Sequence, residues 1–376
     1  MFERPVLILG AGATKACGGP LTDELLPAML EAFREGQANG GESELDLLAR
    51  EFRDFLRSAF HLPVDDGWRL TGPASLPALP LLLSLMDAAV DRGQPLGAFA
   101  PERIALFKRV VQAGVYASLV SQIERRREPG RNAYERLLEP FYASQDQPQP
   151  TVVTLNYDTL VDRAMADLGA ARGLPDFGCD IALPSECATR FGRLLKLHGS
   201  LSWLHCRRCS RLSLHMSGLR KSEDAWGAFA DMFEDLAPAA AFEGDAHCPE
   251  CGEGLEALLI TPSNSKSYSN PHVSRIWYEA ARALRRADRV VFVGYSLPWD
   301  DVEVIYLLKQ NLEHLAPERI TVVEYSKTGA PLNEHEAGKR YSAVFGPGID
   351  WQPLGFTGWL DARERLGGGL LALAPR

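Results

Sequence analysis

The polar residues with the clearest chemical potential stand directly after short apolar runs of the sequence. Asn156 follows the run at residues 151–155, and His198 follows the run at residues 193–197. An amide can orient a hydroxyl group or a water molecule, and an imidazole titrates near neutrality and can accept its proton. If the two runs are strands, both side chains face one crevice, which predicts an active site. Asp158, two residues after the amide, either adds negative charge there or only holds the loop.

A glycine-containing loop follows the first apolar run, residues 5–9. Gly10, Ala11 and Gly12 would let the backbone approach a phosphate. Amide groups near the start of a helix would then interact with the negative charge of that phosphate. The loop lacks the third glycine of the dehydrogenase fingerprint, so a tight strand-to-helix turn without a ligand stays open as an alternative. Other small or polar residues near the ends of apolar runs complete the candidate binding set: Thr14, Thr154, Gly294, Ser296 and Glu324.

Four of the seven cysteines form two Cys-x-x-Cys pairs, Cys206/Cys209 and Cys248/Cys251. In a reducing compartment, such pairs indicate a metal site rather than disulfides. Four thiolates suit a tetrahedral structural zinc ion, and a complete set leaves no open position for a substrate. The 38 residues between the pairs exceed the usual spacing of a zinc ribbon, so we expect the intervening segment to form an excursion of its own.

Predicted strands and helices must position these residues. The strands are expected where short apolar, β-branched runs occur, at residues 5–9, 151–155, 193–197, 256–260, 289–293 and 319–323. Helical patterns occupy residues 24–34, 44–60, 76–92, 101–126, 157–167, 271–286 and 300–314. Because the strand runs are apolar throughout, they fit a parallel sheet covered on both faces. The predicted fold class is therefore α/β, a doubly wound Rossmann-like parallel sheet with a helical insertion and a small zinc-binding module.

The predicted organisation is one domain over residues 1–360, followed by a flexible tail at residues 361–376 that contains three consecutive glycines. About 140 residues separate the first two strands, far more than a βαβ crossover needs, which predicts the insertion. The expected bounds are 1–30, 146–203 and 256–360 for the Rossmann core, 31–145 for the helical insertion and 204–255 for the zinc-binding module.

Composition limits the classes of partner. The chain has 376 residues, of which 46% are hydrophobic and 24% charged, as expected for a globular protein with a full core. Its net charge of −9 argues against sequence-independent binding to nucleic acid or to an anionic membrane. We recognise no secretory signal before the first apolar run, and that run is too short to span a bilayer. We therefore expect a cytoplasmic protein with no direct nucleic-acid or membrane partner.

The order of these motifs resembles that of the sirtuin family. The glycine loop is followed by Thr-x-Asn-x-Asp at residues 154–158, Leu-His-Gly-Ser at 197–200, the two cysteine pairs and Gly-x-Ser-Leu at 294–297. The resemblance covers nearly the whole chain except the helical insertion and the tail. It implies a sirtuin-like domain that binds NAD and a structural Zn²⁺ ion and breaks the nicotinamide–ribose bond of NAD.

In this interpretation, Asn156 orients ribose hydroxyls or the attacking water, and His198 accepts a proton. Asp158 adds negative charge near the ribose C1′ atom or only holds its loop. The cofactor-binding roles are phosphate contacts from Ser296 and the amides around Gly12 and Gly294, a pyrophosphate contact from Thr14 and an adenosine-ribose contact from Glu324.

Three departures from typical deacylase sirtuins change the expected reaction. Residues 18–22 read Gly-Gly-Pro-Leu-Thr where deacylases have Gly-Ile-Pro-Asp-Phe-Arg, and Leu155 stands where they have Gln. Residues 261–268 replace the Phe-Gly-Glu segment that pairs with the acyl-lysine peptide. With Asn-Tyr-Asp at 156–158 and Gly-Tyr-Ser-Leu-Pro at 294–298, the chain looks like the prokaryotic sirtuin-like branch of antiviral systems.

That resemblance implies an NAD⁺ hydrolase, or NAD⁺ glycohydrolase, that releases nicotinamide and ADP-ribose as the NAD-depleting effector of a bacterial anti-phage defence system. The alternatives are an NAD-dependent protein deacylase or ADP-ribosyltransferase, and a non-catalytic sensor of NAD or ADP-ribose. By analogy, we expect control through a homo-oligomer or a regulatory protein partner, either an ATPase or an Argonaute-like protein.

Overall fold

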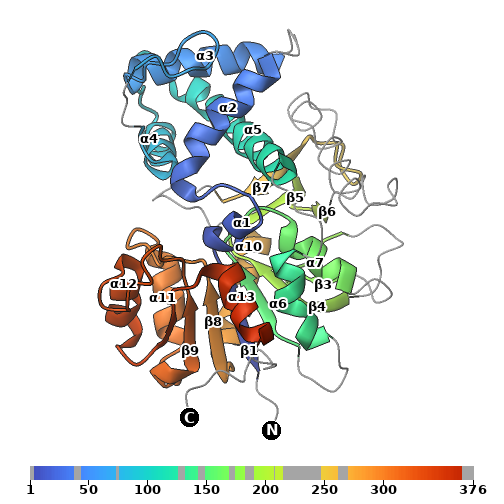
Figure 1. Cartoon of the computed structure of the whole chain (residues 1–376). Coiled ribbons are helices and arrows are strands. Elements are labelled where there is room, and N and C mark those ends of the chain that lie inside the picture. Colours follow the sequence, from blue (N-terminus) through green and yellow to red (C-terminus); the bar gives the residue numbers. More distant parts are fainter. Residues whose placement is uncertain are drawn as a thin grey trace. The chain divides into compact units, whose positions relative to one another are not determined.

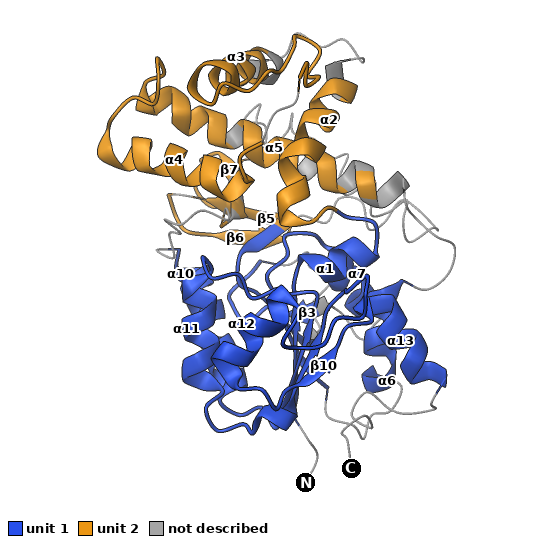
Figure 2. Cartoon of the chain, turned by 60° about the vertical axis from the view of Figure 1, so that its left-hand side comes forward, with its two compact units in different colours: residues 1–19, 126–200, 268–376 blue, residues 20–125, 201–267 orange. Residues whose placement is uncertain are grey.

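The computed structural model describes residues 4–37, 44–72, 76–125, 132–142, 149–168, 174–182, 190–206, 208–214, 247–260 and 270–365. The chain divides into two compact units (Figure 2). Unit 1 comprises residues 1–19, 126–200 and 268–376, and unit 2 comprises residues 20–125 and 201–267. Two segments named above lie outside the described residues: 261–268, and residues 366–376 of the predicted tail.

A seven-stranded sheet with the order β10-β9-β8-β1-β2-β4-β3 forms the centre of unit 1 (Figure 1). All of its neighbouring strands pair in parallel. Its strands are β1 (Pro5–Leu9), β2 (Thr151–Thr154), β3 (Leu174–Asp176), β4 (Arg190–Lys196), β8 (Arg289–Val293), β9 (Ile320–Val323) and β10 (Asp350–Gln352). Every residue of β1 and β8 is buried, which explains why these runs are apolar throughout rather than alternating. The predicted α/β class with a parallel sheet is confirmed.

The helices of unit 1 form two packed groups, as a doubly wound sheet requires. Helices α6 (Ala133–Tyr142), α7 (Leu160–Leu168), α13 (Gly355–Arg365) and the short α1 (Ala11–Ala16) contact one another, and so do α10 (Pro271–Leu284), α11 (Val302–Asn311) and α12 (Glu336–Phe345). The chain moves across the sheet in one direction from β1 to β2 and in the opposite direction from β8 to β10. Since crossovers are right-handed, this reversal puts the two helix groups on opposite faces.

The reversal also locates the expected ligand side of the sheet. In open parallel sheets, ligands bind beyond the carboxyl ends of the strands where the winding direction changes. In unit 1 this point lies between β1 and β8, which are neighbours in the sheet. The loops that leave these two strands, beginning at Gly10 and Gly294, therefore border the place where a ligand is expected.

These two loops cross in direct backbone contact. The amide of Gly10 donates to the Val293 carbonyl at 3.0 Å, and the amide of Gly12 donates to the Gly294 carbonyl at 2.8 Å. A Cβ atom on Gly12 would lie 2.7 Å from the Gly294 Cα atom, and one on Gly294 would lie 2.3 Å from the Ala13 nitrogen. Gly294 also has a φ of +61°, a conformation that glycine adopts without steric cost. The crossing itself therefore requires glycine at these positions.

Unit 2 contains helices and a small sheet. Its helices are α2 (Leu25–Gln37), α3 (Glu44–Ala59), α4 (Leu79–Arg92) and α5 (Pro101–Arg125), with the short 3₁₀ helix η1 (Thr22–Glu24) before α2. Helix α5 packs against the other three, and the rings of Phe52, Phe55 and Phe107 are fully buried between them. These four helices confirm the helical patterns predicted between residues 24 and 126. None of the described helices is long and apolar enough to cross a membrane.

One predicted strand belongs to a different sheet from the one expected. The apolar run at residues 256–260 forms β7 (Leu255–Leu259), but β7 lies in a three-stranded sheet of order β6-β5-β7 with β5 (Gly199–Cys206) and β6 (Leu212–Leu214). Placing this run in the large parallel sheet was therefore wrong. An apolar run shows that a strand is buried, whereas the choice of neighbour depends on chain connectivity and tertiary packing.

Replacing Gly294 with alanine tests whether the loop crossing maintains unit 1. Gly329 is a matched control, because its φ is +67° and a Cβ atom there would have nothing within 4 Å. We expect Gly329→Ala to lower the free energy of unfolding by about 1 kcal/mol, which is the backbone penalty alone. Gly294→Ala adds a clash with backbone atoms and should lower the free energy of unfolding by at least about 3 kcal/mol. Thermal denaturation of the two variants measures the difference, and equal melting temperatures would contradict a tight crossing.

Candidate functional site

The pairing register of β2 and β4 places the two principal candidates at equivalent positions. Thr154 and Lys196 are the last residues of β2 and β4, and they are paired with each other. Asn156 lies two residues after Thr154, and His198 lies two residues after Lys196. The Leu197 amide donates to the Thr154 carbonyl at 3.0 Å, which continues the pairing beyond the strands. The expectation that these two side chains lie at neighbouring strand ends thus agrees with the observed register.

The side-chain amide of Asn156 has one orientation. Its Nδ2 atom donates to the Gly10 carbonyl at 2.9 Å and to the Thr14 hydroxyl at 2.9 Å. A carbonyl oxygen can only accept, so the NH₂ group, rather than the oxygen, must face Gly10. Asn156 can therefore offer its Oδ1 atom to a ligand, as an acceptor for a hydroxyl group or a water molecule.

Asp158 is buried, with 2% of its surface exposed, and both of its oxygens accept hydrogen bonds within the protein. Oδ2 accepts from the Thr14 hydroxyl at 2.5 Å, and Oδ1 accepts from the Leu160 amide at 3.0 Å at the start of α7. Of the two roles considered for Asp158, these contacts support holding the loop.

Lys196, the last residue of β4, also holds the loop that carries Asp158. Its side chain is fully buried, and its Nζ atom donates to the Asp158 carbonyl at 2.5 Å and to the Asp162 carboxylate at 2.7 Å. Burial raises the pKa of Asp162, and the Lys196 charge opposes that rise. A buried lysine is tolerated here because it is both ion-paired and hydrogen-bonded.

His198 is held with a defined tautomer. The residue is 6% exposed, and its Nδ1 atom lies 3.2 Å from the Leu155 carbonyl oxygen. Since that oxygen can only accept, Nδ1 carries the proton and Nε2 is the basic nitrogen of the neutral ring. The Trp277 indole of α10 donates to the Leu197 carbonyl at 2.9 Å and so fixes the peptide before His198. The Tyr157 ring lies 6.2 Å from the imidazole, centroid to centroid.

Two of the predicted binding residues support the site from within the protein. Thr14 is 2% exposed, and its hydroxyl is engaged with Asn156 and Asp158. Thr154 is fully buried, and its hydroxyl accepts from the Asn156 backbone amide at 3.1 Å. Ala11 begins α1, directly after Gly10.

The loop after β8 is fixed by its neighbours. The Tyr295 hydroxyl donates to the Asp301 carboxylate at 2.7 Å, and the Tyr341 hydroxyl donates to the Tyr295 carbonyl at 2.6 Å. The carbonyl of Ser296, an exposed residue, accepts from the Arg340 guanidinium at 2.9 Å. The structure thus holds the Ser296 backbone and leaves its side chain at the surface.

Glu324 directly follows β9, next to the loop after β8. Burial raises the pKa of this carboxyl to about 7, although the Tyr325 amide and the Arg340 charge oppose the shift. Its buried Oε1 atom accepts no hydrogen bond within the described part of the chain. Glu324 therefore carries unused acceptor capacity at the carboxyl end of the sheet.

The raised pKa of Glu324 predicts that stability falls as pH rises. The unfolded carboxyl loses its proton near the ordinary value of 4.5, whereas the folded one keeps it until about 7. Stability is therefore lost progressively as pH rises from about 4.5 through 7. Glu324→Gln removes this dependence, so its melting temperature should match the parent near pH 4.5 and exceed it by a few degrees at pH 8. The test measures the melting temperatures of the parent, of Glu324→Gln and of the exposed control Glu313→Gln across this pH range. A difference between the parent and Glu324→Gln that does not change with pH would disprove the prediction.

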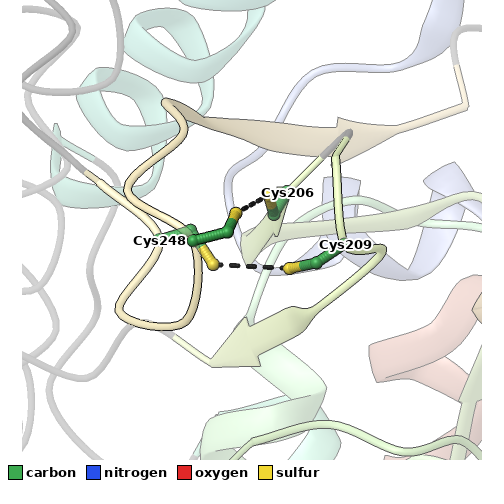
Figure 3. Close-up of side chains that lie close together, drawn as sticks. Cys206, Cys209 and Cys248 are labelled. Carbon is green, nitrogen blue, oxygen red and sulfur yellow. Dashed lines mark hydrogen bonds between the residues drawn. The ribbon is translucent and has the colours of Figure 1, made fainter.

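The four paired cysteines of unit 2 come together, as predicted. Their sulfur atoms lie within 4.8 Å of one another, and Figure 3 shows Cys206, Cys209 and Cys248 converging. A tetrahedral zinc ion with bonds of about 2.3 Å places its sulfurs about 3.8 Å apart, so the cluster fits such an ion after small adjustments. The observed Sγ–Sγ distances of 3.5 Å, for Cys206–Cys251 and Cys209–Cys248, agree with this geometry.

Each pair sits in the same kind of turn. The Cys206 amide donates to the Arg211 carbonyl and the Ser210 amide to the Cys206 carbonyl, both at 2.9 Å. The Cys248 turn repeats these bonds with Glu253 and Gly252, at 2.7 and 2.8 Å. Ser210 and Gly252 both have positive φ, 59° and 72°. The four thiols are thus positioned to bind a structural zinc ion.

Removing one thiol tests this metal centre. Cys209→Ser and Cys251→Ser should lower the zinc content from about one ion per chain to near zero, because serine is a poor zinc ligand. The melting temperature of the chain should fall as well, since metal binding adds folding free energy. Cys179→Ser, outside the cluster, should keep the metal. Elemental analysis after dialysis measures the content, and an unchanged melting temperature after chelation would contradict a structural role.

The structure adds one residue that the sequence did not reveal. Tyr134 of α6 is fully buried, and its hydroxyl lies 3.3 Å from the Thr14 hydroxyl and 3.5 Å from Asn156 Nδ2. No motif marks it, and α6 itself was not predicted. Only the apolar spacing of α6, with its buried face, could have indicated a helix there.

No protein-family model matches this sequence, and no curated protein matches it. Solved structures of Sir2 proteins do match. A Sir2 homologue in complex with NAD covers 96% of this chain and 88% of its own, with 14% identity and a TM-score of 0.42. A mutant Sir2 homologue bound to 2′-O-acetyl ADP ribose covers 98% and 94%, with 15% identity and a TM-score of 0.43.

Proposed function

We propose that the chain is an NAD⁺ hydrolase that cleaves the nicotinamide–ribose bond. The observation that supports this most is the pair Asn156 and His198, which follow two directly paired strands at equivalent positions. One offers an acceptor oxygen and the other a basic nitrogen, and both lie at the carboxyl edge of a parallel sheet. The order of motifs that resembles the sirtuins points to NAD as the molecule on which such a pair acts.

The chemistry needs an acceptor and a base. As the bond between the ribose C1′ and nicotinamide breaks, positive charge develops on the ribose, and nicotinamide leaves with the bonding electrons. A water oxygen then bonds to C1′ and its proton has to be removed. The Asn156 Oδ1 atom orients that water or a ribose hydroxyl, and the His198 Nε2 atom accepts the proton. The products are nicotinamide and ADP-ribose.

Six further candidates are assigned to the dinucleotide. Gly10, Ala11, Gly12 and Gly294 lie in the loops that leave β1 and β8, at the carboxyl end of the sheet, and are assigned to the phosphates, to which the Ser296 hydroxyl adds a donor. Glu324 accepts from the adenosine ribose diol through its unused oxygen.

The proposed biological role is that of an NAD-depleting effector in bacterial anti-phage defence. It rests on the departures from the deacylase motifs, including Leu155 before the Asn-Tyr-Asp sequence. We further propose that activity is controlled by homo-oligomerisation or by a regulatory partner, an ATPase or an Argonaute-like protein, because an unregulated NAD hydrolase would harm its own cell.

Nicotinamide release by the purified chain tests the proposal. Asn156→Ala and His198→Ala should each lower the rate at least about 100-fold, because each removes a group that acts in the bond-breaking or proton-transfer step. His314→Ala is the control, because His314 contacts the Ala287 carbonyl, before the amino end of β8, and should keep the parent rate. Chromatography of the products measures all four proteins.

The products separate the alternatives. Free ADP-ribose formed without an acceptor indicates hydrolysis, whereas acetyl-ADP-ribose or a modified protein indicates a deacylase or a transferase. Tight NAD binding without turnover indicates a sensor. The proposal is overturned if Asn156→Ala and His198→Ala both release nicotinamide at the parent rate.

A further inference from the structure

Four side chains from three segments meet in a buried polar cluster in unit 1. Thr14 comes from α1, Tyr134 from α6, and Asn156 and Asp158 from the loop after β2. Thr14, Tyr134 and Asp158 are at most 2% exposed, so they cannot act by touching a substrate. Only Asn156 is partly exposed. Any effect of the cluster on a reaction therefore passes through Asn156.

The hydrogen-bond directions follow from the chemistry of the groups. The Asp158 carboxylate can only accept, so the single hydroxyl proton of Thr14 points to it across 2.5 Å. The Thr14 oxygen is then left with two acceptor positions. Asn156 Nδ2 fills one of them at 2.9 Å, and the Tyr134 hydroxyl, at 3.3 Å, donates its proton to the other. In this arrangement every position on the Thr14 hydroxyl is used.

Tyr134 is itself firmly placed. Asn132 caps helix α6 by accepting from the backbone amides of Tyr134 at 2.9 Å and Glu135 at 3.0 Å. The tyrosine ring meets the Phe356 ring of α13 edge to face, with 5.7 Å between centroids. Burial raises the pKa of the Tyr134 phenol well above its ordinary value, so the hydroxyl keeps its proton and stays a donor at neutral pH.

We propose that Tyr134 is a positioning residue for Asn156, acting through the Thr14 hydroxyl, and this inference rests on the proposed NAD hydrolysis. The Tyr134 hydroxyl fills the last acceptor position of the Thr14 oxygen, whose own proton points to Asp158. The Thr14 oxygen then presents a lone pair to Asn156 Nδ2. The amide is thereby held with its Oδ1 atom available to the ribose or the water.

Tyr134→Phe removes only the hydroxyl. We expect kcat for nicotinamide release to fall about tenfold, while the Kd for NAD stays within twofold, because the fold and the binding groups are unchanged. Thr14→Val should cause a larger loss than Tyr134→Phe, and also a larger loss than Thr14→Ser, which keeps the hydroxyl. Tyr142→Phe is the matched control, since Tyr142 is a buried tyrosine on the same helix whose hydroxyl lies beside Gly192, and it should leave kcat unchanged.

A double-mutant cycle separates positioning from a general loss of stability. If Tyr134 acts through Thr14, then adding Tyr134→Phe to Thr14→Val causes no further fall in kcat. A further tenfold fall in that background would overturn the inference, and so would a parent-like kcat for Tyr134→Phe alone.

A second readout is independent of turnover. The side-chain NH₂ signals of Asn156 in an NMR spectrum, assigned with Asn156→Asp, should exchange with solvent at least about fivefold faster in Tyr134→Phe than in the parent or in Tyr142→Phe. An unchanged exchange rate would overturn the positioning role. If the parent chain releases no nicotinamide but this exchange responds as expected, the proposed hydrolysis fails and the positioning of Asn156 by Tyr134 stands.

Discussion

The geometry of the candidate site depends on one backbone crossing, where the loop after β1 passes the loop after β8. Two hydrogen bonds, from Gly10 to Val293 and from Gly12 to Gly294, join the loops at a distance that leaves no room for a Cβ atom. The crossing fixes the Gly10 peptide, and the Gly10 carbonyl is the group that orients the Asn156 amide. A shift of the β1 loop would therefore change which atom Asn156 presents to a ligand.

The polar groups around this crossing are stable in the interior because nearly all of their hydrogen-bonding capacity is used. Burying an unpaired hydroxyl or carboxylate costs several kcal/mol, whereas a fully satisfied network rigidifies its surroundings. The loop that carries Asn156 is held at its start by the Thr154 hydroxyl and further on by Lys196, which binds the Asp158 carbonyl. A side chain on a loop restrained in this way is preorganised, which is what a catalytic acceptor requires.

Much of the fold could be predicted from sequence because the signals are local. The apolar runs of β1, β2 and β8 mark buried parallel strands, and the spacing of Cys206 and Cys209 marks a metal-binding turn without knowledge of the rest of the chain. The neighbour of β7 could not be predicted, because an apolar run does not specify its partner strand. Tyr134 could not be predicted as part of the site, since its contact with Thr14 joins residues 120 positions apart in the sequence and depends on how α6 packs.

The structure also changes which residues carry the functional argument. The Gly10-Ala11-Gly12 sequence resembles a phosphate-binding loop, but the crossing with the β8 loop requires small residues there whether or not a phosphate binds. The amides of Gly10 and Gly12 donate to protein carbonyls and are therefore already engaged. The register of β2 and β4, by contrast, places Asn156 and His198 at equivalent positions after two paired strands, and neither residue type is needed to close a turn. Asn156 and His198 thus support the proposed nucleotide-cleaving site more than the glycines do.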